Sequence, residues 1–186
     1  MNKILILGPQ GGGKGTQANI LAKKLGIPAL SMGHLLRNEI ATGSDLGKQI
    51  DTIIHGERPL VPDYMALDVL KKRMEKDDAK GGYILDGYPR TVEQLKAFKS
   101  YDTPTVLLVI NIPHDESIER LRKRAETEGR KDDTPELIAR RLELYEEETK
   151  PVIAEYEEQG IVKYVDGMGS IEEVAERVKK ALDLPK

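Results

Sequence analysis

The sequence lacks cysteine altogether, which excludes disulfides, thiolate catalysis and cysteine-based zinc sites. It also lacks any stretch near the ~20 consecutive apolar residues that a membrane-spanning helix needs. Neither sign of charge is in large excess. The 29 basic and 32 acidic residues are well mixed along the chain and leave a formal charge of −3. No basic block or patch of aromatic and basic residues stands out. We therefore expect neither a membrane protein nor a dedicated nucleic-acid binder.

The composition is that of a globular protein. Hydrophobic residues make up 39% of the chain and charged residues 33%, as in folded rather than disordered proteins. With 186 residues, the chain is long enough for one domain with its own core. The apolar run Ile4–Leu7 is too short for the hydrophobic region of a signal peptide and fits a strand. We expect a cytoplasmic monomer.

Short apolar runs alternate with longer segments of helical period, without an internal repeat. Five runs are predicted to be strands: Ile4–Leu7, Ala29–Leu30, Tyr83–Leu85, Thr105–Ile112 and Ile161–Val165. Helices are predicted over Lys14–Leu25, in three patterns within residues 33–76, over His114–Ala125, over Pro135–Tyr156 and from Ser170 onward. This alternation predicts an α/β fold of three αβα layers around a five-stranded parallel sheet, with ligands at the carboxyl ends of the strands.

Several residues mark where the predicted helices begin, bend or end. Gly26 is placed to end the first helix. Thr134 is a candidate N-cap followed by Pro135, and Ser170 begins a capping-box pattern. Pro151 lies inside the predicted helix Pro135–Tyr156, so we expect a kink or a split there.

The glycine-rich segment Gly8–Thr16 predicts a phosphate site. Five glycines in eight positions let the backbone turn its N–H groups into a concavity, and a helix follows at once. The positive end of that helix faces the same point. Lys14 can reach the β- and γ-phosphates of a nucleotide, and a hydroxyl behind it can approach a bound Mg²⁺. The generic phosphate loop has Ser or Thr directly after the lysine, whereas here Gly15 intervenes before Thr16.

With Gly15 between Lys14 and Thr16, this segment resembles the phosphate loop of the adenylate kinase and UMP/CMP kinase family. Family members carry Ser-Thr-Gly-Asp, two apolar residues and arginine after the second strand, and here residues 31–37 read Ser-Met-Gly-His-Leu-Leu-Arg. The resemblance implies that Arg37 clamps the phosphate of an acceptor nucleotide, for which a planar guanidinium is suited. Met32 replaces the threonine that contacts adenine in adenylate kinases, and His34 replaces the aspartate. We expect weaker discrimination between bases from Met32, and leave the role of His34 open.

The segment from Asp86 to Thr91 reads Asp-Gly-Tyr-Pro-Arg-Thr and resembles the family's Asp-Gly-Phe-Pro-Arg motif. The resemblance implies that Arg90 is a second arginine on the acceptor phosphate and that Asp86 orients water bound to Mg²⁺. Gln94 stands where adenylate kinases read the adenine edge, and Thr91 stands where UMP/CMP kinases typically have asparagine. These residues favour AMP as acceptor.

A set of arginines follows the fourth predicted strand. Arg120 and Arg124 are four residues apart and share a helix face. By resemblance they contact ATP and the transferred phosphoryl group, while Arg130 and Arg141 bridge both substrates. Asp132 and Asp133 are then expected to pair with arginines when this region closes. Because the intervening segment is short, the resemblance implies the short-lid form of the family, without structural zinc.

The resemblance covers essentially the whole chain and assigns each site residue a role. Catalysis is expected from Lys14, Arg90, Arg124, Arg130 and Arg141. ATP is expected on Gly11, Gly12, Gly13, Lys14, Gly15, Thr16, Arg120, Arg124 and Gly169. The acceptor is expected on Ser31, Met32, Arg37, Leu60, Val61, Gly87, Arg90, Gln94, Arg130 and Arg141. Mg²⁺ would arrive with ATP and lie near Thr16 and Asp86 through water, with no direct protein ligand assigned.

The expected layout is one kinase domain. Its core would comprise residues 1–30, 63–123 and 136–186, with a nucleoside monophosphate-binding segment at 31–62 and a short lid at 124–135. The predicted reaction is reversible transfer of the ATP γ-phosphate to AMP.

Three other classes of function share single features with this sequence. A UMP/CMP kinase, a base-promiscuous nucleoside monophosphate kinase or a shikimate-type kinase would share the phosphate loop, but the block from Asp86 to Gln94 argues against shikimate. A GTPase would need an Asn-Lys-x-Asp segment after Thr105–Ile112, and none is present. A nucleotide-binding module without activity would have little use for so many arginines.

Overall fold

The computed structural model describes residues 2–56, 60–128 and 134–184, and within them five parallel strands form one sheet in the order β2-β3-β1-β4-β5. The strands are β1 (Asn2–Leu7), β2 (Ala29–Ser31), β3 (Gly82–Asp86), β4 (Val106–Asn111) and β5 (Val162–Asp166). Each predicted strand is present, with bounds shifted by one or two residues. The predicted fold class is therefore confirmed.

The central strand β1 is covered on both faces, as its continuous apolar run requires. Ile4 and Ile6 point into one layer of the core, and Leu5 and Leu7 into the other. All four are at most 3% exposed. Since β1 pairs with β3 on one side and β4 on the other, the carboxyl ends of these strands meet at one edge of the sheet.

The described residues also form nine α-helices. They are α1 (Lys14–Leu25), α2 (Met32–Ala41), α3 (Asp45–Ile54), α4 (Asp63–Met74), α5 (Val92–Lys99), α6 (His114–Glu128), α7 (Pro135–Leu144), α8 (Lys150–Glu157) and α9 (Ile171–Ala181). A 3₁₀ turn at Asp77–Ala79 precedes β3, and a π-helical turn at Tyr145–Thr149 joins α7 to α8. None of the helices in the described ranges is both long and apolar enough to cross a membrane.

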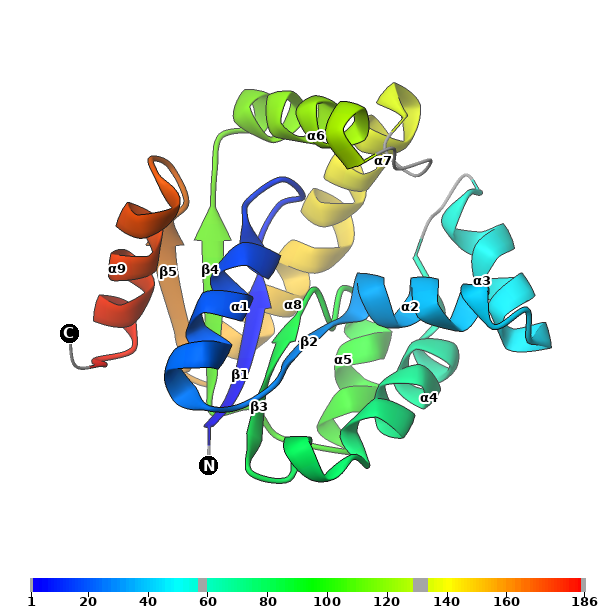
Figure 1. The fold of residues 1–186 in the computed structure, drawn as a ribbon, viewed down its shortest axis with the longest axis horizontal. Helices are drawn as coiled ribbons and strands as arrows, with labels where there is room; N and C mark the ends of the chain where they lie inside the picture. Colours follow the sequence, from blue (N-terminus) through cyan, green and yellow to red (C-terminus); the bar gives the residue numbers. More distant parts are fainter. Residues whose placement is uncertain (1, 57–59, 129–133, 185–186) are drawn as a thin grey trace.

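Two layers of helices enclose the sheet (Figure 1). Helices α1 and α9 pack through Ala18, Leu21 and Val174 against one face. Helices α4, α5 and α8 cover the other face, where Phe98 and Tyr156 are fully buried. This is the αβα arrangement that the alternation of elements predicted.

The capping residues lie where the sequence placed them. Gly26 ends α1 in the left-handed region with φ of 65°. The Thr134 hydroxyl accepts from the Leu137 amide at the start of α7, and Ser170 and Glu173 form a complete capping box on α9. Each of these caps depends on residues only a few positions apart, so the sequence alone was enough to predict it.

Two elements differ from the sequence-based expectation. Helix α5 was not predicted, because its eight residues make only two turns and show too little of a helical period; its start is nevertheless capped by the Thr91 hydroxyl, which accepts from Gln94. The helix expected over Pro135–Tyr156 is divided, as Pro151 predicted, but the division lies ahead of the proline. Helix α7 ends at Leu144, the π-helical turn Tyr145–Thr149 follows, and Pro151 lies in the first turn of α8, which continues to Glu157.

The arrangement places three groups of elements around the carboxyl edge of the sheet. In Figure 1 the loop after β1 lies below α6 and α7, while α2 and α3 project to one side. The chain therefore surrounds the glycine-rich loop with the arginines of α2, α6 and α7.

Candidate active site

The glycine-rich loop connects β1 to α1 through backbone conformations that favour glycine. Gly8, Gly11 and Gly13 have φ of 139°, 80° and 76°. A Cβ on Gly8 would collide with the carbonyl oxygen of Ile110 on the neighbouring strand. Gly13 is the N-cap of α1 and brings no side chain to its first turn, so the first amides of the helix are left for a ligand.

Lys14 lies at the start of α1 and is partly buried. Its Nζ donates to the carbonyl oxygen of Pro9 at 2.7 Å, which folds the side chain back over the loop. Burial lowers the pKa of Lys14 to about 8; the negative charge of Asp86 opposes this shift, and Arg90 and Arg124 add to it. An anion placed in the loop would offset both effects and raise the pKa of Lys14 again.

Asp86 ends β3 directly beside the start of α1. A Cβ on Gly15 would lie 3.4 Å from Asp86 Oδ2, in ordinary van der Waals contact, so the carboxylate lies directly beside the residue that follows the lysine. Asp86 Oδ1 is buried without a hydrogen-bond partner in the described structure. A water molecule held by a cation would satisfy this orphaned oxygen. Thr16 is exposed and lines the same cavity.

Arg90 is held by its neighbours in the loop between β3 and α5. Its Nε donates to the carbonyl oxygen of Gly87 at 2.7 Å, and its amide donates to Gln94 Oε1 at 2.8 Å. Burial lowers the pKa of Arg90, which the charge of Asp86 opposes. Three further arginines lower the pKa as well: Arg141, Arg37 and Arg124. Because arginines stay charged, a bound anion would reduce the repulsion within this cluster.

Gln94 is 4% exposed and spans two parts of the acceptor side. Its Oε1 accepts from the Arg90 amide, while its Nε2 donates to the carbonyl oxygen of Val61 at 2.7 Å. One donor and one acceptor position of the amide are left over. Such a pair suits the edge of a base, as the sequence predicted for this residue.

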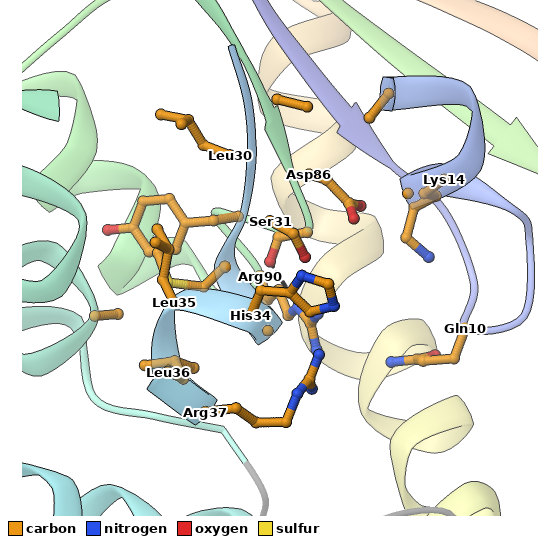
Figure 2. A pocket seen from close by; sticks show the side chains of 18 of the residues that line it. Gln10, Lys14, Leu30, Ser31, His34, Leu35, Leu36, Arg37, Asp86 and Arg90 are labelled. Atoms are coloured by element: carbon orange, nitrogen blue, oxygen red, sulfur yellow. Dashed lines mark hydrogen bonds between the residues drawn. The ribbon is translucent and has the colours of Figure 1, made fainter. Parts of the chain in front are cut away.

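Helix α2 contributes further cavity residues that the sequence analysis assigned to the acceptor. Arg37 folds back over the helix, since a Cβ on Gly33 would lie 3.3 Å from Arg37 Nη1. Figure 2 shows Arg37 and His34 reaching from α2 toward the space that Lys14 faces from α1 and Asp86 from β3. Met32 is 3% exposed, because its side chain belongs to the core cluster under the cavity.

Helix α6 provides Arg120 and Arg124, both partly buried. Arg120 is already engaged, because its Nε donates to Glu116 at 2.6 Å and its Nη1 to the carbonyl oxygen of Gly167 at 3.3 Å. It thereby ties α6 to the turn after β5. Arg124 is close enough to lower the pKa of Lys14, and so stands over the phosphate loop.

One cavity of about 660 Å³ unites the two sides. It is lined by most of the predicted site residues: Gly11, Gly13, Lys14, Gly15, Thr16, Ser31, Met32, Arg37, Leu60, Val61, Asp86, Gly87, Arg90, Gln94, Arg120, Arg124 and Arg141. Its size is in the range of small-molecule sites. Gly12 and Gly169 do not line it. Arg130, Asp132 and Asp133 lie outside the described residues.

The cavity also has residues to which the sequence assigned no role. Gln10 lines it, and its Oε1 is buried without a partner among the described residues. Nothing in the loop pattern identifies that position, since any residue type is allowed there. The described chain contains no group of three or more His, Asp or Glu side chains that could hold a metal ion by themselves.

The comparisons agree with this geometry. The family model described as adenylate kinase matches residues 6–161. A curated adenylate kinase of Kocuria rhizophila is 40% identical over 188 residues, covering 98% of this chain and all of the relative. Adenylate kinases of Bifidobacterium longum and Micrococcus luteus are each 42% identical, covering 97% and 98% of this chain and 100% and 91% of their own lengths. With a glycine-rich phosphate loop facing clustered arginines across one cavity, and relatives matching along the whole fold, the chain belongs to the adenylate kinase family.

Proposed function

We propose that the chain reversibly transfers the γ-phosphate of ATP to AMP, using the residues of the cavity described above. The observation that supports this most is the meeting of two positive surfaces. Lys14 and the amides of the loop lie on one side, and Arg37 and Arg90 lie on the other. Two anionic substrates placed on these surfaces would bring their phosphates together between them.

The reaction needs little covalent help from the protein. A phosphate oxygen of AMP is a competent nucleophile, so no general base is required. It attacks the γ-phosphorus as the bond to the β-γ bridging oxygen breaks, which leaves two molecules of ADP. Catalysis then rests on aligning the substrates in line and stabilising the charge on the moving phosphoryl group.

The arginines and the lysine divide this work in our proposal. Lys14 and the loop amides hold the β- and γ-phosphates of ATP. Arg37 and Arg90 hold the AMP phosphate. Arg124 and Arg141 line the cavity between them and would stabilise the transferred group. Arg120, already bonded to the carbonyl oxygen of Gly167, would position the adenosine side of ATP.

Mg²⁺ is proposed to enter with ATP and to shield charge on its phosphates. Asp86 would hold a water of the ion through its unpartnered Oδ1, and the Thr16 hydroxyl would face the same ion. Mg²⁺ retains several waters in such sites, which fits a protein surface with one carboxylate rather than a cage.

The two ends of the cavity are proposed to close over the substrates, because water inside would hydrolyse ATP. Residues 31–62 would close as the monophosphate-binding segment and residues 124–135 as a short lid. The remaining residues, 1–30, 63–123 and 136–186, would form the core that holds the phosphate loop.

AMP is the proposed acceptor. Gln94 has one donor and one acceptor position left for a base edge, and the relatives bear the name adenylate kinase. No finding favours UMP or CMP. We further propose that the enzyme acts as a cytoplasmic monomer without nucleic-acid partners, in keeping with its mixed surface charge.

A coupled assay of ADP formation from MgATP tests the function. AMP should be the preferred acceptor, with CMP and UMP slower. Arg90→Met should abolish most of the activity while leaving the fold intact. An enzyme that hydrolysed ATP equally well with and without AMP would contradict the proposal.

A further inference from the structure

A buried threonine outside the cavity holds the main chain of Arg90. Thr149 is 5% exposed and lies at the end of the π-helical turn that joins α7 to α8. Its hydroxyl donates to the carbonyl oxygen of Arg90 at 3.0 Å, across 59 residues of sequence. It is one of four buried polar residues in the described structure, and its partner, Arg90, belongs to the loop between β3 and α5.

The π-helical turn places this hydroxyl. The amide of Lys150 donates to the carbonyl oxygen of Tyr145, five residues earlier, so one extra residue is accommodated in the turn. Pro151 follows and has no amide with which to continue the α-helical ladder. An extra residue rotates everything after it by about 100° relative to α7, and this change of phase turns Thr149 toward Arg90.

The same bond links the segments that carry two arginines of the cavity, Arg90 and Arg141. Arg141 lies on α7, eight residues before Thr149 in the continuous helical path, and its charge is the largest of those that lower the pKa of Arg90. Two like charges repel, so their side chains stay close together only if the backbones that carry them are held. Gln94 holds the amide of Arg90 and Gly87 holds its Nε, but both belong to the loop and to α5. Thr149 connects Arg90 to the helical path that carries Arg141.

We propose that Thr149 is a positioning residue for the acceptor phosphate. Its hydroxyl, held in phase by the π-helical turn, keeps Arg90 at the spacing from Arg141 that one phosphate group requires. The inference rests on the proposed function, in which Arg90 binds AMP. Thr149 does not touch substrate and acts through the Arg90 carbonyl.

Replacing the hydroxyl by a methyl group tests the proposal. Thr149→Val keeps the shape and loses the donor, and should raise KM for AMP about five- to tenfold, the range expected for one lost hydrogen bond. KM for ATP should change less than about twofold, because Lys14 and the loop are untouched. Thr149→Ser, which keeps the hydroxyl, should restore KM for AMP to near the parent value.

Thr105, an exposed threonine, offers a control at the opposite end of the sheet. Its hydroxyl donates to the carbonyl oxygen of Lys3 at 3.1 Å, also between residues far apart in sequence. Thr105→Val should lower the melting temperature while leaving KM for AMP unchanged. If Thr149→Val does no more than Thr105→Val, Thr149 is merely structural and the proposal is wrong. Should Thr149→Val fail to fold, Thr149→Ala takes its place with the same expected pattern.

Arg90→Met separates this inference from the function on which it rests. If Arg90→Met leaves KM for AMP unchanged, the proposed role of Arg90 is wrong and the inference falls with it. If Arg90→Met raises KM and Thr149→Val does not, the inference alone is wrong. In support of the proposal, Thr149→Val should have no further effect on KM for AMP in the Arg90→Met background.

Discussion

The donor and acceptor sides of the cavity are built in opposite ways. The phosphate loop of the donor side is one continuous segment, Gly8–Thr16, which follows the four buried residues Ile4–Leu7 of β1. The acceptor side is assembled from β2 and α2, the residues before α4, the loop before α5, and α7. The donor side is therefore a local structure held by the sheet, whereas the acceptor side exists only when distant segments pack together.

This difference has a consequence for stability and for motion. The donor loop is covalently tied to the core at both ends, so it can be rigid before any substrate binds. On the acceptor side, burial and then the charges of Arg141, Arg37 and Arg124 lower the pKa of Arg90. We expect the bound phosphate to complete the acceptor side, and the following predictions, from the largest effect to the smallest, test the contrast.

Arg124 lines the cavity between the two sides, so its loss should have the largest effect on turnover. Arg124→Ala is expected to lower kcat by about a thousandfold, as with other arginines that stabilise a transferred phosphoryl group. Circular dichroism and the melting temperature should stay near the parent values. Arg122→Ala, an exposed arginine on the same helix, is the control and should be active. If Arg124→Ala unfolds the protein, Arg124 is structural.

The rigidity of the donor side can be tested at Gly8. Gly8→Ala places a Cβ against the Ile110 carbonyl oxygen at a φ of 139°, and should destabilise the fold by roughly 3 kcal/mol. Gly43→Ala is the matched control, because its φ is 70° and no atom lies within 4 Å of the added Cβ; it should cost only about 1 kcal/mol. Urea denaturation measures both, and equal losses would contradict the prediction.

The charge of Lys14 should make the donor side sensitive to alkaline pH. Its pKa of about 8 in the free protein means that the ammonium is present below pH 8 and lost above it, so KM for ATP should rise by up to about tenfold per pH unit above 8. The phosphates of the substrates are already ionised there. Lys14→Arg cannot lose its charge in this range and should abolish the rise, whatever its activity. If KM for ATP in the parent enzyme did not change with pH above 8, Lys14 would not bind ATP through its charge.

The lowered pKa of Lys14 has the opposite effect on the stability of the ligand-free fold. Between about pH 8 and 10.5 the unfolded chain binds more protons at Lys14 than the folded chain does. This group therefore makes the ligand-free protein more stable as the pH rises through that window. Comparing melting temperatures of the parent enzyme and Lys14→Met over the window measures this contribution.

The smallest effect is expected at the base end of the acceptor side. Met32→Thr should restore a hydroxyl near the base and increase the preference for AMP over CMP in kcat/KM by about three- to tenfold. Met65→Thr controls for the cost of a polar atom in the same core cluster, since Met65 is buried there but does not line the cavity. A preference that does not change in Met32→Thr would mean that Met32 does not set base selectivity.

The donor side could be predicted from the sequence almost completely, because its glycines, Lys14 and the following helix are neighbours in the chain. The individual acceptor arginines were also predicted, but only by resemblance, since isolated arginines such as Arg37 and Arg141 are indistinguishable from surface residues. The sequence could not indicate Gln10, helix α5 or the bond from Thr149, whose significance depends on what lies beside each of them in space.

By itself, the sequence determined the strands, the helix caps and the phosphate loop, because hydrophobic period and backbone conformation act over a few residues. Only the tertiary structure decided which polar groups meet. It placed Asp86 against Gly15, brought Arg90 and Arg141 to one cavity and put a π-helical turn between α7 and α8 just before Pro151. The physical reason is that hydrogen bonds and charge repulsion depend on distances of a few ångströms, and for distant residues the packing of the core sets those distances.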